Sequence, residues 1–220
     1  MNSQVIGEEM LQWAKDLFPY CRSITGDGTR QTLAYFQNIN PELELITFKT
    51  GEKVFDWDIP KEWNIVDAYL EHESGKRFAE FKKNNLHVLN YASPIDQVFK
   101  LEDLSDHIYT SPKQPDLIPY VTSYYSERWG FCMSHEEKCN MPKGNYRAFI
   151  DSTLEDGTLN LTHAVIEGTS SQEIFFSSYV CHPSMANNEL SGPVLLSALM
   201  RYVKQQYPEA KDVMLLWNML

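Results

Sequence analysis

The spacing of apolar and polar positions predicts helices near the start of the chain. Apolar residues recur at helical spacing along one face of residues 4–18, and Pro19 ends this pattern. A turn-forming cluster then precedes a second helical pattern over residues 27–38, in which Leu33 and Phe36 are expected to face the core. The chain therefore opens with two amphipathic helices.

From residue 43 to residue 180 the pattern changes to short β-branched and aromatic runs, separated by prolines and turn-forming residues. Strands are expected in three of these runs: 44–48, 63–69 and 86–91. The only helical pattern in this stretch is a short one at 101–107. We expect residues 52–140 to form an inserted β-rich domain, and residues 1–51 and 141–220 to form an α/β core.

The end of the chain predicts a strand, a loop, a helix and a second strand. Residues 173–180 are a nearly continuous apolar run, the type of strand that is buried on both faces of a sheet. A polar loop at 181–189 follows, then a helical pattern at 190–202 and an apolar run at 212–220. This order is a βαβ unit, and ligand sites in such units gather at the carboxyl ends of the strands. The loop 181–189 is therefore the candidate functional site.

This loop offers donors for a metal ion. His182 at a strand end is a good zinc ligand, Glu189 returns across the loop as an oxygen donor, and Asn188 is a weaker, neutral ligand. The alternative is a histidine that is hydrogen-bonded within a sheet. Cys181 and His182 are adjacent, so in a continuous strand their side chains point to opposite faces and cannot pair as nucleophile and base.

A second group of soft side chains lies in the expected insertion. Cys132, His135 and Cys139 offer three ligands. Structural zinc sites normally have four, with paired spacings. A polar hairpin loop with two free thiols is therefore the preferred interpretation over a zinc site.

The insertion is also rich in aromatic residues, which favours the core of a small β domain. Tyr124, Tyr125 and Trp129 lie near a turn and are the candidates for substrate binding, because such rings can stack on a peptide or a sugar.

Composition narrows the functional classes. The chain has 220 residues, of which 43% are hydrophobic and 22% charged, as in ordinary globular proteins. Its 19 Lys plus Arg and 30 Asp plus Glu give a net charge of −11, so no nucleic-acid partner is expected through these residues. Four cysteines do not make a disulfide scaffold, no run approaches the roughly 18 apolar residues of a membrane span, and no signal peptide opens the chain. We expect a cytoplasmic protein with no membrane association.

Several long motifs resemble, in the same order, the bacterial aminopeptidase-like domain proteins. This family is of largely unknown function and is often labelled as polysaccharide biosynthesis proteins. The most specific match is SYVCHPSMANNELSGP at 178–193, and CRSITGDG at 21–28 is similar to the family's opening. Further segments resemble its inserted domain and return strands: 54–65, 118–125, 129–132 and 150–157. The family resembles the dizinc aminopeptidases in turn.

The resemblance implies an α/β, zinc-peptidase-like (phosphorylase/hydrolase-like) three-layer sandwich, incomplete in this chain, with an inserted β-rich domain. In the dizinc relatives a histidine after a central strand binds one zinc, which matches His182, and an aspartate bridges both metals at the position of Asn188. A neutral amide cannot bridge two zinc ions as a carboxylate does, and the neighbouring Glu189 is the candidate substitute. Ser184 replaces an aspartate that orients the imidazole. One or two zinc ions are the implied cofactors.

In the dizinc relatives the next strand leads to a Glu-Glu pair that supplies the general base and a ligand. Here that strand is 212–220, so the catalytic general base is expected beyond Leu220, and the chain resembles the N-terminal half of the family. The implied function is a zinc-dependent aminopeptidase-like hydrolase of peptide or amide bonds, incomplete or inactive as this chain alone. The alternative is a non-catalytic peptide- or sugar-binding module associated with polysaccharide biosynthesis. Expected partners are a small peptide or amide substrate and further copies of the chain in a homo-oligomer.

Overall fold

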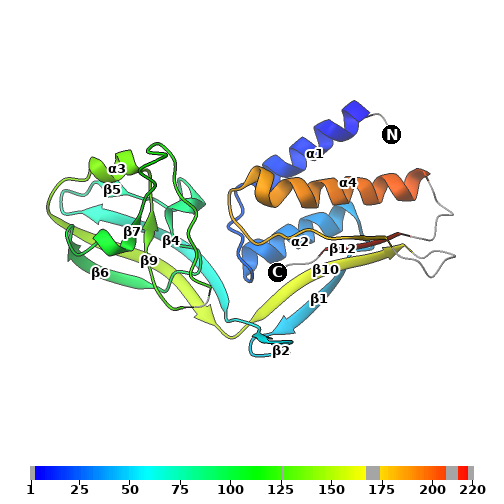
Figure 1. The fold of residues 1–220 in the computed structure, drawn as a ribbon, viewed down its shortest axis with the longest axis horizontal. Helices are drawn as coiled ribbons and strands as arrows, with labels where there is room; N and C mark the ends of the chain where they lie inside the picture. The colour runs from blue at the N-terminus through cyan, green and yellow to red at the C-terminus, as the bar shows by residue number, and fades with distance from the viewer. Residues whose placement is uncertain (1–2, 125, 167–173, 207–212, 218–220) are drawn as a thin grey trace. The chain divides into compact units, whose positions relative to one another are not determined.

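The fold consists of two compact units, which are coloured along the chain in Figure 1. The computed structural model describes four stretches of the chain: residues 3–124, 126–166, 174–206 and 213–217. One unit, termed the core unit, combines residues 1–61 with 156–220. The other, termed the inserted unit, is residues 62–155.

Three long helices belong to the core unit: α1 (Ser3–Leu17), α2 (Asp27–Ile39) and α4 (Ser191–Gln206). They confirm the helical patterns at 4–18, 27–38 and 190–202, whereas the short pattern at 101–107 forms only the 3-10 turn Ser105–His107. Leu33 and Phe36 of α2 are both buried, as expected. The amide of Asn40, just after α2, donates to Ser197 Oγ of α4 at 3.0 Å, which ties the two helices together. None of the helices in the described stretches is both long and apolar enough to cross a membrane.

The main sheet of the core unit has the strand order β1-β10-β12-β11, and α2 and α4 lie over one of its faces (Figure 1). Its strands are β1 (Glu44–Lys49), β10 (Thr158–Ile166), β12 (Val213–Trp217) and β11 (Ile174–Phe176). β11 and β12 are parallel with α4 between them in sequence, which confirms the βαβ unit. β10 is antiparallel to β1 and to β12. A short hairpin joins β2 (Lys53–Val54) to β3 (Trp57–Asp58).

The strand expected at 173–180 is shorter than its apolar pattern suggested. Within the described residues, β11 ends at Phe176, whose pairing with Leu215 is the last in the ladder. Residues 177–185 form no strand. Apolar character alone cannot hold a segment in a sheet when no neighbouring strand continues the hydrogen bonding. The backbone that carries the candidate loop is therefore free to turn.

The inserted unit is built on an antiparallel sheet of order β5-β4-β9-β6. Its strands are β5 (Arg77–Phe78), β4 (Glu62–His72), β9 (Asn145–Glu155) and β6 (Ile95–Lys100). Around it lie β7 (Ile108–Tyr109), β8 (Phe131–Cys132), α3 (His135–Cys139) and two 3-10 turns, η1 (Asn85–His87) and η2 (Ser105–His107). The sequence predicted no long helix in this part of the chain, and the described residues of this unit form none.

The prediction of a strand at 86–91 is wrong. Asn84 accepts a hydrogen bond from the backbone N–H of Leu86, which caps the 3-10 turn η1 instead. Only isolated bridges at Val88 and Asn90 follow.

The inserted unit also has other bounds than the expected 52–140. β9 pairs along its length with β4 and β6, so residues 141–155 pack with the insertion. The β2–β3 hairpin lies before Glu62 and belongs to the core unit.

Candidate metal centre before helix α4

The loop between β11 and α4 runs very close to the start of that helix. A Cβ atom on Gly192 would lie 2.3 Å from Ser178 Oγ and 3.3 Å from Ser178 Cβ, so any larger residue would require the serine side chain to move. The residues just before α4, Ala186–Leu190, form a π-helical turn, which holds more residues than an α-turn and is frequent at functional sites. Ser191 Oγ donates to the carbonyl of Asn187 at 2.5 Å and fixes the junction.

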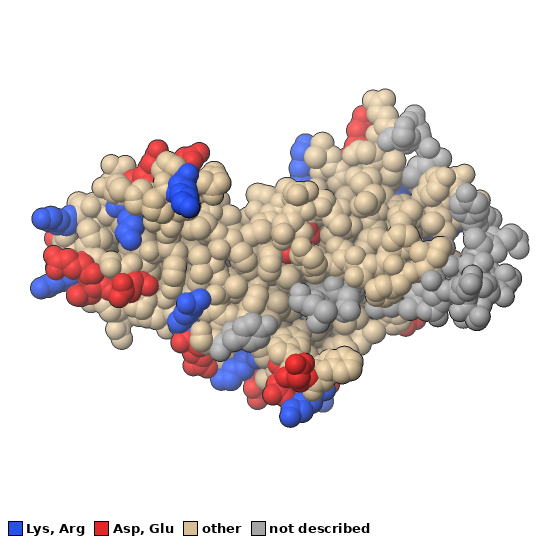
Figure 2. Space-filling model, in the orientation of Figure 1, with Lys and Arg blue, Asp and Glu red and all other residues tan. Residues whose placement is uncertain are grey.

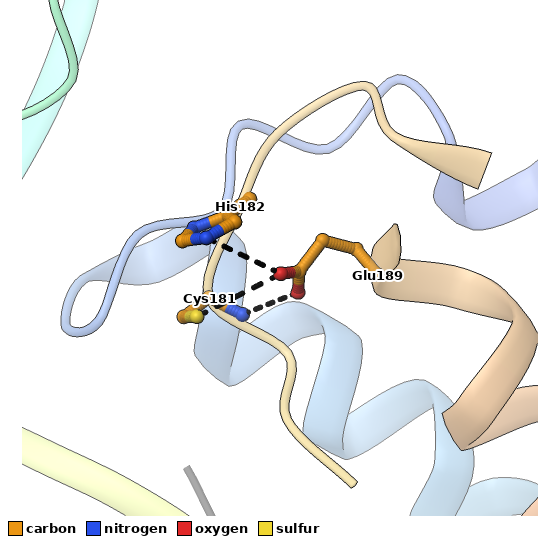
Figure 3. A group of neighbouring side chains, drawn as sticks. All are labelled: Cys181, His182 and Glu189. Atoms are coloured by element: carbon orange, nitrogen blue, oxygen red, sulfur yellow. Dashed lines mark hydrogen bonds and ion pairs between the residues drawn. The ribbon is translucent and has the colours of Figure 1, made fainter. Parts of the chain in front are cut away.

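The π-turn places Glu189 against Cys181 and His182 (Figure 3). The backbone N–H of Cys181 donates to Glu189 Oε2 at 2.8 Å, and Cys181 Sγ lies 3.7 Å from Oε1. His182 Nε2 also lies 3.7 Å from Oε1. Across the described stretches, these three form the one group of His, Cys, Asp or Glu side chains that could hold a metal ion, with ligand atoms all within 4.8 Å of one another. We term them the 181/182/189 cluster.

A buried arginine supports the cluster from the N-terminal part of the chain. Arg22 has no exposed surface. Its Nε donates to the carbonyl of His182 at 3.0 Å and its Nη1 donates to the carbonyl of Leu17 at 2.6 Å. These bonds fix the backbone at His182 relative to the end of α1. The same guanidinium places a positive charge in the interior near Glu189.

Burial dominates the electrostatics of the cluster. It raises the pKa of Glu189 to about 7, while the backbone N–H groups of Cys181 and His182 and the charge of Arg22 act in the opposite direction. Burial lowers the pKa of His182 and raises that of Cys181, where the Glu189 carboxylate adds to the rise. It also lowers the pKa of Arg22 to about 10. Near neutral pH the imidazole is therefore in the neutral form that binds metals.

The donor set of the cluster fits zinc. Zinc binds sulfur, imidazole nitrogen and carboxylate oxygen at about 2.0–2.3 Å, so neighbouring ligands around a tetrahedral ion are separated by about 3.3–3.8 Å. Both separations to Glu189 Oε1, 3.7 Å from sulfur and 3.7 Å from nitrogen, lie at the upper end of this range, and all three ligand atoms lie within 4.8 Å of one another. Three protein ligands with a fourth, open position are typical of catalytic zinc.

The structure brings together two of the three residues that the sequence proposed as metal ligands, His182 and Glu189. Asn188 lies in the π-turn with an exposed side chain. Cys181 was missed, because strand geometry would have pointed it away from His182. The missed signal was Pro183, which cannot donate to a strand ladder and so argues against a strand through this segment.

The aromatic candidates of the inserted unit take part in its own packing. Tyr124 is half-buried and its hydroxyl lies 2.7 Å from that of Tyr120. Trp129 stacks on His107 with ring centroids 3.6 Å apart and an interplanar angle of 5°. Tyr125 lies outside the described residues. Substrate binding by these three residues stays a prediction.

The thiols of the inserted unit are free, as the sequence indicated. Cys132 is buried in β8, whereas Cys139 is exposed at the end of α3. His135 Nδ1 lies 3.2 Å from Thr110 Oγ1. Within the described stretches, Cys132, His135 and Cys139 do not form a metal-binding group.

Comparison with known proteins relates both units to other bacterial proteins. Residues 62–153 match the family described as "Domain of unknown function (DUF2172)". A Clostridium acetobutylicum protein, provisionally named a polysaccharide biosynthesis protein with aminopeptidase-like domain, is 43% identical over 196 residues, which is 89% of this chain and 45% of that protein. A crystal structure from the same species, provisionally named a peptidase, is 39% identical with a TM-score of 0.92, over 99% of this chain and 51% of that one. The chain thus spans about half the length of these relatives.

More distant structures share the fold alone. BSAP, a zinc aminopeptidase from Bacillus subtilis, is 8% identical with a TM-score of 0.57, over 96% of this chain and 59% of that one. A peptidase M28 precursor from Shewanella amazonensis is 8% identical with a TM-score of 0.53, over 98% and 67%. The expected fold class, an α/β fold like that of zinc aminopeptidases, is confirmed.

Proposed function

Because this chain is related to the bacterial proteins that carry an aminopeptidase-like domain, we propose that its 181/182/189 cluster supplies part of a zinc site for the hydrolysis of peptide or amide bonds. One observation carries the proposal. The buried carboxylate of Glu189 lies 3.7 Å from His182 Nε2, in the loop that follows β11. A buried carboxylate is costly unless it is paired or binds a metal.

His182 and Glu189 are the proposed zinc ligands. When bound, zinc lowers the pKa of a water molecule and polarises the scissile carbonyl. Arg22 positions the loop by donating to the carbonyl of His182. Asn188, at the place of the bridging aspartate, brings no charge to a second ion, so we propose one zinc at this cluster, with a second only if Asn188 joins through its amide oxygen.

The remaining machinery is proposed to lie in the part of the relatives that this chain does not span. That part would supply the general base, a glutamate, and further ligands. The proposed substrate is a small peptide or amide with a free α-amine. We therefore expect no hydrolysis of aminoacyl-nitroanilides by these 220 residues alone.

The test is the metal content of the chain purified without chelators, measured by elemental analysis. We expect about one zinc per chain, lost in His182→Ala and reduced in Glu189→Gln. His163→Ala is the matched control, since this histidine lies in β10 of the same unit and outside the cluster. Equal zinc in the wild type and in His182→Ala, or no zinc in any of them, contradicts the proposal.

A second candidate is a non-catalytic peptide- or sugar-binding module. The neutral Asn188 at the bridging position favours it, because the co-catalytic arrangement then lacks a carboxylate. Calorimetric titration with a dipeptide amide or a short oligosaccharide, in the presence of a chelator, distinguishes the two. Binding that needs no metal supports the module, whereas binding that appears only with zinc supports the hydrolase site.

A further inference from the structure

We propose that Cys181 is a metal ligand, so that this chain holds its ion between a thiolate, an imidazole and a carboxylate. The inference rests on the proposed function and deepens it, because it assigns a third ligand and a preference for soft ions. The resemblance to the dizinc aminopeptidases implies no sulfur ligand, and the ligands selected from the sequence were His182, Asn188 and Glu189.

The geometry centres on one oxygen atom. Glu189 Oε2 accepts the backbone N–H of Cys181 at 2.8 Å, which fixes the carboxylate and leaves Oε1 directed at the other two side chains (Figure 3). Cys181 Sγ and His182 Nε2 each lie 3.7 Å from Oε1. All three ligand atoms lie within 4.8 Å of one another, so small rotations of the side chains bring sulfur, nitrogen and oxygen around one ion.

Adjacent residues can converge in this way because their backbone is not a strand. β11 ends at Phe176, and Ser184 has a positive φ of 47° that bends the chain after the cluster. Arg22 Nε donates to the carbonyl of His182 and holds the backbone at this point. Both side chains can then turn toward Glu189 of the π-turn.

The chemistry of the cluster is consistent with a metal–thiolate bond. Cys181 is 2% exposed and Glu189 has no exposed surface, so the sulfur lies in a dry environment beside an anion. When a divalent ion binds, the S–H bond breaks, a metal–sulfur bond forms and the proton passes to solvent. The two anionic ligands and the charge of Arg22 then leave a net charge of +1 around a divalent ion. A thiolate favours zinc and cadmium over manganese or magnesium.

Cys132 provides the matched comparison. It is also a fully buried free thiol, but it lies in the inserted unit and in no metal-binding group of the described residues. The same substitution, cysteine to serine, can therefore be made at two buried thiols that differ in their surroundings.

The test uses the full chain, stripped with a chelator and titrated with cobalt(II) as a spectroscopic substitute for zinc. We expect a near-ultraviolet thiolate-to-cobalt charge-transfer band in the wild type and in Cys132→Ser, and none in Cys181→Ser. Competition titrations should show zinc affinity at least tenfold lower in Cys181→Ser, with a larger loss for cadmium. Circular dichroism of each variant verifies that it is folded.

The outcomes separate this inference from the proposed function. Cobalt absorption without the charge-transfer band, together with unchanged zinc affinity in Cys181→Ser, overturns the role of Cys181 and leaves a site made by His182 and Glu189. A wild type that binds neither cobalt nor zinc overturns both. If Cys181→Ser is unfolded, the other three cysteine-to-serine variants decide, at Cys21, Cys132 and Cys139. Retention of the band in all three assigns it to Cys181, and its loss in any of them overturns the role of Cys181.

Discussion

The core unit and the inserted unit both carry exposed ion pairs, but they differ in whether Arg and Glu side chains are also fully buried. In the core unit, Arg22 and Glu189 have no exposed surface. In the inserted unit, Arg147 pairs with Asp96 at 2.6 Å, and the two side chains remain 41% and 54% exposed. On the face drawn in Figure 2, charged side chains are dense over the inserted unit and around β2–β3, and sparse over α4.

Completely buried charged side chains indicate a candidate reactive site. Burying a charged group costs far more than leaving it in water, so a fold that buries several together uses them or pairs them closely. The inserted unit instead buries neutral rings, for example Trp63 stacked on Tyr91 at 5.9 Å. We read the inserted unit as a self-contained framework and the core unit as the location of reactive groups.

The largest expected effect is the loss of the aromatic centre of the inserted unit. Trp63 is 2% exposed and its Nε1 donates to the carbonyl of Ala92 at 2.9 Å. Trp63→Ala should lower the unfolding free energy of that unit by about 4–6 kcal/mol, the sum of a cavity and a lost hydrogen bond. Hydrogen exchange with mass spectrometry, measured at increasing urea concentrations, should show that the unfolding free energy of the core unit is unchanged. Val98→Ala, at an exposed position of the same unit, should change it by less than about 0.5 kcal/mol. Simultaneous unfolding of both units would contradict the independence of the inserted unit.

The next effect is on the buried arginine. Arg22→Met removes the donors to the carbonyls of Leu17 and His182 and leaves Glu189 without a nearby opposite charge. We expect a loss of about 3–5 kcal/mol in the core unit, measured by urea unfolding. Glu189→Gln in the same background should recover part of this loss, as a double-mutant cycle would show. The control Arg147→Met, on the surface of the inserted unit, should cost much less. A similar cost for both arginines would refute the contrast between the units.

Local sequence patterns predict the helices of the core unit, but they do not predict the contacts between distant residues at its candidate site. The amphipathic patterns predicted α1, α2 and α4, because a helix face repeats within a few residues. His182 and Glu189 could be selected from their place after a predicted strand. The bond from Arg22 to the carbonyl of His182 joins residues 160 positions apart, and no local pattern reveals such a contact. Cys181 was missed for a related reason, since the end of β11 depends on a partner strand distant in sequence.

The stability of the metal-free chain should fall as the pH rises, because of Glu189. Burial raises its pKa to about 7, so the folded chain holds this proton more tightly than the unfolded chain does. The contribution is complete below about pH 4.5, the ordinary pKa of the group, and is lost as the pH rises through 7. Between these limits it amounts to about 3 kcal/mol.

Urea unfolding at pH 5 and pH 8 in a chelator measures this dependence. Glu189→Gln should remove the corresponding slope, and Glu136→Gln, at an exposed position of α3, should leave it unchanged. If the free energy of unfolding of Glu189→Gln changes with pH as steeply as that of the wild type, Glu189 is not the source of the pH dependence. The buried carboxylate of the core unit would then not differ in titration from the surface carboxylates of the inserted unit.

The smallest expected effect is chemical and leaves the fold intact. Exposed Cys139 should be the first thiol alkylated by iodoacetamide at pH 8. Burial raises the pKa of Cys132 to about 12 and also raises that of Cys181, so both should react at least about 100-fold more slowly. Peptide mass spectrometry over time measures the rates. Zinc should slow the alkylation of Cys181 further and leave the alkylation rate of Cys132 unchanged. Equal protection of the two thiols by zinc would contradict this difference between the units.

The π-helical turn Ala186–Leu190 has a consequence for how the gene can change. Successive residues of an α-helix are rotated by about 100°. Deleting one codon within this turn would convert it to α-helical spacing and swing the preceding loop around the helix axis, separating Glu189 from His182 even though every ligand remained encoded. Natural variation in this loop should therefore proceed by exchange of amino acids, with insertions and deletions confined to positions outside it.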